Sequence, residues 1–301
     1  MSFSIRPAIR FFLKVINLYK DNSWYANRRA ILDYCGRVDS PIFACLQHGV
    51  HICQFTKNLG KRKLQSTVPF LCWSKKVEKY CKHNGVKNIH VIGSPFLYFH
   101  RKNKKKNTPQ GTIFFPAHGD RRNDIKFKHK KFLEIIKSFP KPHTVSIFYD
   151  NYNNEVKKFY HNNNIQVVCN GHRDSKDFLS NLYFNLSIHK NVVLTELGST
   201  LFYSLFLKKN TFLTIKYKNK YLSKIKQTEV IVSQYKNYLK RNKFLLSRKI
   251  DLKKGYALAK QELGYNYIKK PKQLIKILDL NNYFKNIIKY FLSMLLRLRS
   301  F

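Results

Sequence analysis

One segment, residues 191–215, constrains the fold more than any other part of the chain. The short apolar run at 192–194 is typical of a buried parallel strand, and a second apolar run ends the segment. Between them, the Gly-Ser-Thr turn at 198–200 leads into a helical stretch at 201–207. We expect Gly198 to permit a sharp turn where a larger residue would clash, and one of the two hydroxyls to cap the helix. The segment therefore predicts a strand–helix–strand unit of an α/β fold.

The turn at 198–200 is also a candidate phosphate site. The first amides of a helix have no partners within the helix and carry the positive end of its dipole. An anion at this position gains hydrogen bonds and a favourable charge interaction together. An ordinary capped helix has the same composition, so the segment alone leaves both interpretations open.

The alternation of strands and helices extends upstream through the second half of the chain. Apolar runs predict strands at 112–116, 144–149 and 165–169, and helical patterns predict helices at 127–139, 153–162 and 175–187. This order indicates a parallel, helix-flanked sheet, in which ligands bind beyond the carboxyl ends of the strands. The loops at those ends should converge on one crevice; they are His118-Gly119-Asp120, Asp150-Asn151, Gly171-His172-Arg173 and Gly198-Ser199-Thr200.

The first half shows a similar, shorter pattern. An apolar run at 42–46 leads into Gln47-His48-Gly49, which we interpret as a strand ending in a functional loop. The other expected elements are helices at 24–34 and 74–84 and a strand at 88–92. The Lys-rich tract 101–111 has linker composition. We therefore expect an N-terminal domain over 1–107, a second domain over 108–240 and a basic helical tail over 241–301.

Charge and cysteine usage restrict the class of protein. The chain has 58 Lys and Arg against 16 Asp and Glu, a net charge of +42, so we expect an anionic partner. Six cysteines show no metal-site spacing, which indicates free thiols in a reducing compartment and no structural metal. The N-terminal segment is interrupted by basic residues, so we expect neither a signal peptide nor a membrane span, and a cytoplasmic protein. Residues 283–301 form an amphipathic pattern that suits either an interfacial helix or one packed on the fold.

The layout resembles glycosyltransferases with two Rossmann-like domains (GT-B), in particular bacterial surface-polysaccharide enzymes such as teichoic-acid glycerophosphotransferases and bacterial sialyltransferases. The resemblance covers residues 40–215 and rests on CLQHGV, VIGSP, FFPAHGD and TELGSTLFYSLFLKKNTFL in that order. It implies an α/β fold of two parallel sheets that face a central cleft, followed by basic helices. It also implies metal-independent transfer of a sugar or polyol phosphate from a nucleotide-activated donor to a cell-surface glycan or lipid-linked acceptor, as in capsule or lipopolysaccharide synthesis.

The resemblance implies roles for individual residues. His48 would be the general base, and His118 would contact and protonate the leaving phosphate, although Gly119 replaces the proline of the family. The donor-binding residues would be Gly171, His172, Arg173, Glu196, Gly198, Ser199 and Thr200, with Glu196 on a ribose hydroxyl and the 198–200 turn on the phosphate. Tyr203 stands where the glycerophosphotransferases commonly have an aspartate, so the donor could differ. No cofactor beyond the donor substrate is implied.

The acceptors of such enzymes are commonly membrane-bound, so the basic surface and residues 283–301 predict peripheral attachment to the inner face of the cell membrane. Two alternatives stay open. A nucleic-acid-binding protein would suit the charge and the 15% aromatic content, but the chain has no recognisable nucleic-acid motif and its charge is dispersed. A sugar-nucleotide epimerase would share the two-domain architecture without needing a cationic surface.

Overall fold

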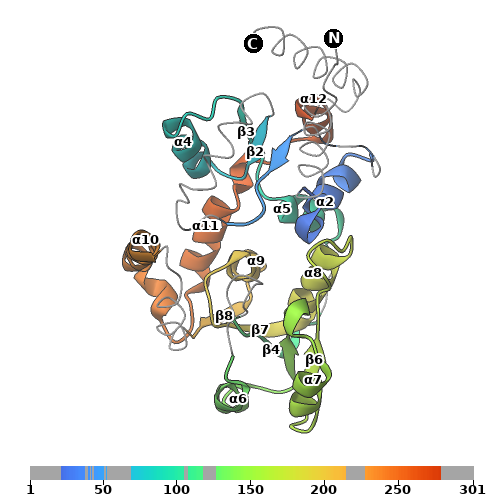
Figure 1. The fold of residues 1–301 in the computed structure, drawn as a ribbon, viewed down its shortest axis with the longest axis vertical. Helices are drawn as coiled ribbons and strands as arrows, with labels where there is room; N and C mark the ends of the chain where they lie inside the picture. Colours follow the sequence, from blue (N-terminus) through green and yellow to red (C-terminus); the bar gives the residue numbers. More distant parts are fainter. Residues whose placement is uncertain are drawn as a thin grey trace, which may run out of the picture.

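The structure is a computed structural model that describes residues 22–37, 40, 42, 44–50, 52, 69–104, 108–117, 127–214 and 228–278. Two predicted features lie outside these residues, namely the His118-Gly119-Asp120 loop and the amphipathic segment 283–301. The described chain is α/β and contains two parallel sheets, which Figure 1 shows one above the other. This confirms the expected fold class of two parallel, helix-flanked sheets.

The smaller sheet has three strands in the order β1 (Cys45–Leu46), β2 (Phe70–Cys72) and β3 (Ile89–Val91). Its register pairs Leu46 with Leu71, and Leu71 with His90. The surrounding helices are η1 (Trp24–Ala26), α2 (Asn27–Tyr34), α4 (Lys75–His83) and α5 (Pro95–Lys102). The predicted helices at 24–34 and 74–84 and the strand at 88–92 are confirmed, whereas β2 and α5 are additions to the predicted pattern.

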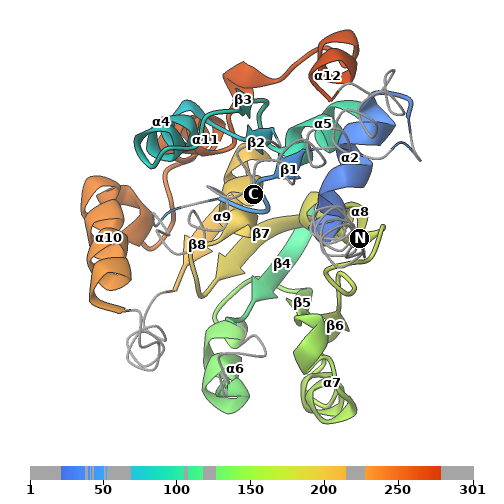
Figure 2. The ribbon, with the colours of Figure 1, turned by 45° about the horizontal axis from the view of Figure 1, so that its top comes forward.

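The larger sheet has five strands in the order β6-β5-β4-β7-β8, which Figure 2 shows from its edge strand β6 to β8. Its strands are β4 (Gln110–Phe115), β5 (His143–Ser146), β6 (Gln166–Val168), β7 (His189–Leu194) and β8 (Asn210–Leu213). The flanking helices are α6 (His129–Lys137), η2 (Tyr149–Asn151), α7 (Asn154–His161), α8 (Phe178–Ile188) and α9 (Ser199–Phe206). The strand order reverses between β4 and β7, and such a reversal leaves a crevice beyond the carboxyl ends of the two strands.

The last described segment comprises α10 (Thr228–Arg241), η5 (Lys243–Leu246), α11 (Leu252–Glu262), η6 (Tyr265–Tyr267) and α12 (Pro271–Ile277). It is helical, and its helices pack into two of the hydrophobic clusters. Ala259 and Leu263 are fully buried in the main core, and Leu274 is buried in the core of the smaller sheet. This packing follows from the apolar side chains that recur at helical spacing between the lysines, because the apolar face of such a helix is buried against another element.

One of the hydrophobic clusters contains residues from both halves of the fold. Phe96 of α5 stacks on Tyr203 of α9 with ring centroids 4.0 Å apart and an interplanar angle of 8°. Beside this pair, His100 Nδ1 lies 3.0 Å from the Tyr183 hydroxyl of α8. Helix α5 therefore packs the smaller sheet against the helices of the larger one.

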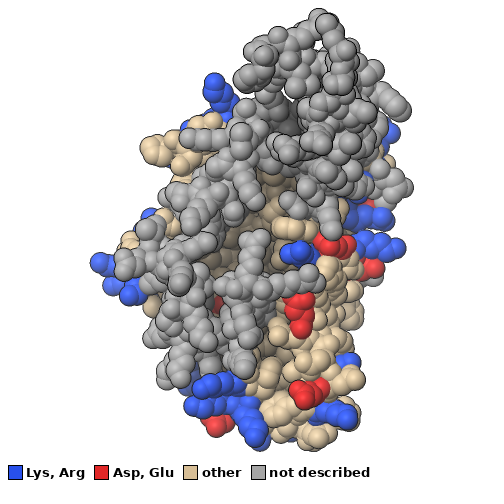
Figure 3. All heavy atoms as spheres, viewed as in Figure 1, with Lys and Arg blue, Asp and Glu red and all other residues tan. Residues whose placement is uncertain are grey.

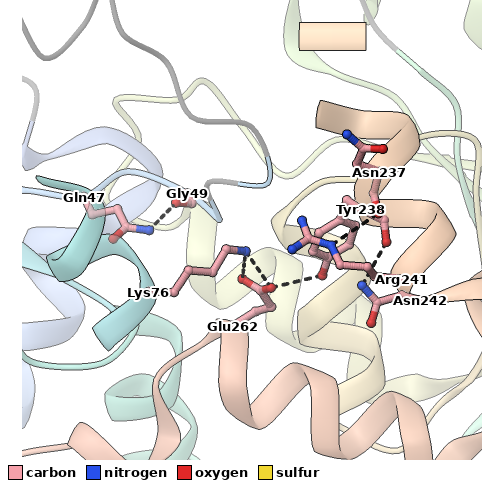
Figure 4. Close-up of polar contacts among 8 residues, drawn as sticks. All are labelled: Gln47, Gly49, Lys76, Asn237, Tyr238, Arg241, Asn242 and Glu262. Carbon is pink, nitrogen blue, oxygen red and sulfur yellow. Dashed lines mark hydrogen bonds and ion pairs between the residues drawn. The ribbon is translucent and has the colours of Figure 1, made fainter. Parts of the chain in front are cut away.

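The chain crosses back to the smaller sheet at Gly264, which has a φ of +69°. A Cβ at this position would lie 1.6 Å from the carbonyl oxygen of Trp73, so no larger residue fits without moving the backbone. Next to the crossing, Glu262 binds Lys76 Nζ through both carboxylate oxygens, at 2.8 and 3.0 Å, and accepts a hydrogen bond from the Tyr238 hydroxyl at 3.2 Å (Figure 4). This contact ties α4, α10 and α11 together.

Lys and Arg side chains are spread along the edges of the visible described surface rather than gathered in one patch (Figure 3). Among the described residues, no helix has the length and apolar character needed to cross a bilayer.

Candidate functional site

A cavity of about 350 Å³ lies at the carboxyl ends of the larger sheet, where the strand order reverses. It is lined from the larger sheet and its helices by Phe115, Pro116, Ser146, Ile147, Phe148, Tyr149, Asn170, Gly171, Phe178, Leu179, Leu182, Leu194, Glu196, Gly198, Ser199, Thr200 and Tyr203. Tyr25, His48 and Gly49 close it from the side of the smaller sheet. Six of the predicted site residues therefore meet in one place: His48, Gly171, Glu196, Gly198, Ser199 and Thr200.

The N-terminus of α9 forms one wall of the cavity. Gly198 is its N-cap residue, with φ −155° and ψ −176°, and no side chain caps the helix. The expected hydroxyl cap is therefore wrong, because Ser199 and Thr200 are the first residues inside the helix. The expected steric need for glycine is wrong as well: Gly198 has an extended backbone, and a Cβ there would meet no heavy atom within 4 Å. The fold therefore does not require glycine at position 198. Because glycine has no side chain, it leaves the N-terminal end of α9 open to a ligand.

Ser199 connects this helix to the loop after β1. Its hydroxyl oxygen accepts a hydrogen bond from the Val50 backbone N–H at 3.0 Å. A Cβ at Gly49 would lie only 3.0 Å from the same oxygen, so the loop and the helix are in close contact. Tyr203 also hydrogen-bonds to Ser199 and to Ser94. Burial raises the pKa of Tyr203 well above its ordinary value, which keeps its phenol protonated and neutral.

A buried glutamine holds the turn that carries His48 into the lining of the cavity. The Gln47 side chain is 1% exposed, donates to the Gly49 carbonyl at 2.7 Å and accepts from the Trp73 backbone N–H at 2.9 Å. The His48 carbonyl accepts from Asn27 Nδ2 at 3.3 Å, and its ring lies 4.8 Å from the ring of Trp24. These contacts fix the turn that carries the imidazole, a group able to accept or donate a proton near neutral pH.

Only the first residue of the predicted Gly171-His172-Arg173 loop lines the cavity. Gly171 adopts φ +96°, a conformation that favours glycine. The exposed His172 ring lies 4.2 Å from Tyr149, and its Nδ1 accepts from the Asp174 backbone N–H at 3.2 Å. Arg173 instead places its guanidinium 4.6 Å from the ring centroid of Trp24. His172 and Arg173 therefore lie outside the lining of this cavity, and their contact with a nucleotide stays a prediction.

Sequence reasoning missed several residues of the site. Asn170 is 8% exposed and donates to Ser146 Oγ at 3.1 Å, while Asn185 Nδ2 donates to the Asn170 side-chain oxygen at 2.9 Å. Phe148 and Tyr149 add an aromatic wall after β5. Asn170 directly follows the predicted strand at 165–169, which was the available signal for this residue. Phe148 and Tyr149 lie inside the predicted strand at 144–149, whereas β5 ends at Ser146.

The described residues contain no group of three or more His, Cys, Asp or Glu side chains that could hold a metal ion. Comparison of the chain with protein-family models, with characterised proteins and with solved structures gave no match.

Proposed function

We propose that the protein is a GT-B-type glycosyltransferase that moves a sugar, or a related polyol phosphate, from a nucleotide-activated donor to an acceptor hydroxyl. The observation that supports this most is the composition of one cavity, which is lined both by the N-terminus of α9 and by His48. The two follow strands of different sheets, β7 and β1. This position at a strand-order reversal is where open α/β sheets bind nucleotides.

In a sugar transfer, the acceptor oxygen forms a bond to the anomeric carbon while the bond from that carbon to the phosphate oxygen breaks. His48 takes the proton of the acceptor hydroxyl. Negative charge grows on the leaving phosphate, and the amides of Ser199 and Thr200 at the positive end of α9 stabilise that charge more in the transition state than in the ground state. Glu196 and Gly171 would contact the nucleoside, and His118 would protonate the leaving phosphate. None of these steps is assigned to a metal ion.

Thermal-shift measurements with CMP-, CDP-, UDP- and GDP-linked sugars test donor binding. A donor present at 100 times its dissociation constant should stabilise the protein by about 2.7 kcal/mol. The Ser199→Ala/Thr200→Ala double variant should weaken that shift, whereas His48→Ala should bind the donor normally and lose turnover. The proposal fails if no nucleotide changes the melting temperature, or if the two variants show the reverse pattern. Sequence-selective nucleic-acid binding at physiological salt, without nucleotide-sugar binding, would favour the alternative class.

We also propose that the enzyme docks on an anionic membrane surface through η5 and the start of α11. Leu246 and Leu252 are 54% and 40% exposed there. The exposed basic residues around them are Lys240, Arg241, Lys243, Arg248, Lys249, Lys253 and Lys254. Asp251, the one acidic residue in 240–254, is occupied as the cap of α11, accepting from the Lys254 backbone N–H at 2.7 Å. Exposed leucines among lysines suit the boundary between lipid headgroups and acyl chains.

A further inference from the structure

Trp24 and Arg173 form a layered contact beside His48. The Arg173 guanidinium lies 4.6 Å from the Trp24 ring centroid, and the same indole lies 4.8 Å from the His48 ring. The three side chains come from η1, from the loop after β6 and from the loop after β1. They therefore form one stacked wall that ends at His48, the member of the three that lines the cavity.

Two hydrogen-bond donors in this wall lack acceptors. Arg173 Nε and Trp24 Nε1 are both buried from solvent, and neither has a hydrogen-bond partner in the part of the chain that the structure describes. Within that part, no carboxylate forms an ion pair with Arg173, and the adjacent Asp174 has its Oδ2 3.5 Å from His172 Nδ1. A buried indole N–H ordinarily finds a partner, and so does a buried guanidinium N–H. The two N–H groups therefore lack an acceptor of hydrogen bonds, and the positive charge of Arg173 favours an acceptor that carries negative charge.

The backbone around Trp24 is fixed in an unusual conformation. Tyr25 and Ala26 have φ values of 58° and 57°, in the left-handed region that few non-glycine residues adopt. The Tyr25 N–H donates to the Arg173 carbonyl at 2.5 Å, which joins the two segments directly. Asn22, fully buried, donates to the Ala44 carbonyl at 2.6 Å and accepts from the Leu46 N–H at 2.8 Å, so the turn is anchored to β1. Strained turns of this kind concentrate at ligand sites.

We propose that Trp24 and Arg173 form an anion subsite for the acceptor, so that the enzyme glycosylates an acidic glycan whose carboxylate or phosphate binds there while its hydroxyl faces His48. This rests on the proposed function, because it assigns the acceptor of the same reaction. The subsite is distinct from the donor phosphate site, since Arg173 does not line the cavity that α9 bounds. The planar guanidinium and the indole N–H offer donors that a carboxylate or phosphate can accept together.

Calorimetric titration with D-glucuronate, D-glucose 6-phosphate and neutral D-glucose tests the subsite on the whole chain. We expect one or both acidic sugars to bind at least tenfold more tightly than glucose. Arg173→Gln should abolish that preference. Trp24→Phe keeps the ring under the guanidinium and removes only the N–H donor, so it should reduce the preference about threefold to tenfold. Binding of glucuronate alone would identify a carboxylate as the acidic group, and binding of glucose 6-phosphate alone a phosphate.

Tryptophan fluorescence locates the bound sugar. The chain has two tryptophans, and Trp73 is 1% exposed in the core, so a Trp73→Phe variant reports Trp24 alone. We expect saturable quenching or a spectral shift with the acidic sugar and none with glucose. Equal binding of all three sugars, or acidic-sugar binding that Arg173→Gln leaves unchanged, would overturn the subsite. Thermal shift measures donor binding separately. If donors bind and acidic sugars do not, the subsite is refuted and the transferase is not. If acidic sugars change the fluorescence of Trp24 and no donor changes the melting temperature, the transferase is refuted.

Discussion

Replacing Gly198 by alanine should have opposite effects on two quantities: the free energy of unfolding should rise, and the affinity for the donor should fall. Gly198 has φ −155°, which alanine adopts freely, and its Cβ would have no heavy atom within 4 Å. The folded state therefore loses nothing, while the unfolded chain loses conformational freedom. We expect a gain in the free energy of unfolding of about 0.4–1 kcal/mol, which corresponds to a rise in melting temperature of roughly 1–4 °C for a chain of this size.

The same methyl group should weaken donor binding. It would project into the open space beside the first amides of α9, where the proposed phosphate approaches. Losing one hydrogen bond to a charged oxygen costs about 1.5–3 kcal/mol, which is roughly a 10- to 150-fold increase in the dissociation constant of the donor. The assay is thermal shift and calorimetry with the nucleotide-sugar that stabilises the wild type.

Gly36→Ala is the matched control. A Cβ at Gly36 also meets no heavy atom within 4 Å, but Gly36 has φ +67° and does not line the cavity. This variant should lose stability slightly and bind the donor normally, which is the opposite pattern. If Gly198→Ala binds the donor as tightly as the wild type does, the phosphate does not bind at the N-terminus of α9. If Gly198→Ala is instead strongly destabilised, the open geometry at this residue is wrong.

Three further outcomes are expected. Glu262→Ala should lower the free energy of unfolding by about 2–4 kcal/mol in urea titrations. This loss is somewhat smaller than for a fully buried ion pair, because Lys76 is 34% exposed. The double variant Lys76→Met/Glu262→Met should recover most of the loss. Leu246→Glu/Leu252→Glu should reduce sedimentation with vesicles of anionic lipid severalfold and leave donor binding intact; unchanged sedimentation would place the docking surface elsewhere. Burial lowers the pKa of Lys209 to about 8 from its usual 10.5, so the unfolded chain holds this proton where the folded chain has released it. Stability relative to Lys209→Met should therefore rise between pH 8 and 10.5, and parallel pH profiles for the two proteins would contradict the shift.

Much of the larger sheet could be predicted because its strands lie in short stretches rich in β-branched and apolar residues that are bounded by turn residues. The helix α5 was missed although its signals are present: Ser94 accepts a hydrogen bond from the Phe96 N–H at 3.3 Å, and Pro95 occupies the first helical turn. The adjacent Lys-rich tract dominated the interpretation of this region. The strand β2 was missed because a run of three residues, Phe70–Cys72, is too short to show periodicity.

Residues of the candidate site could be predicted from the sequence only where they lie near the end of a predicted strand. The alternation of strands and helices placed Gly171, Glu196 and the 198–200 turn on one edge of the sheet, and the structure brings them to one cavity. Whether a side chain turns toward that cavity depends on loop geometry, which is why the sequence did not show that Arg173 lies outside its lining. The contact between Arg173 and Trp24 joins segments from opposite halves of the chain, and no local pattern in either segment encodes it.

The return of the chain to the smaller sheet has a consequence for synthesis on the ribosome. That sheet ends at residue 91, yet its core includes Leu274 and Leu278. At about 5–20 residues per second, these two leucines are made on the order of 10–40 s after the last strand that they cover. During that interval the nascent N-terminal half exposes an apolar face that its own residues cannot bury. Burial of this face is therefore completed only when the last helices are made, and a chain truncated before α12 should be a target for chaperones rather than a shorter folded protein.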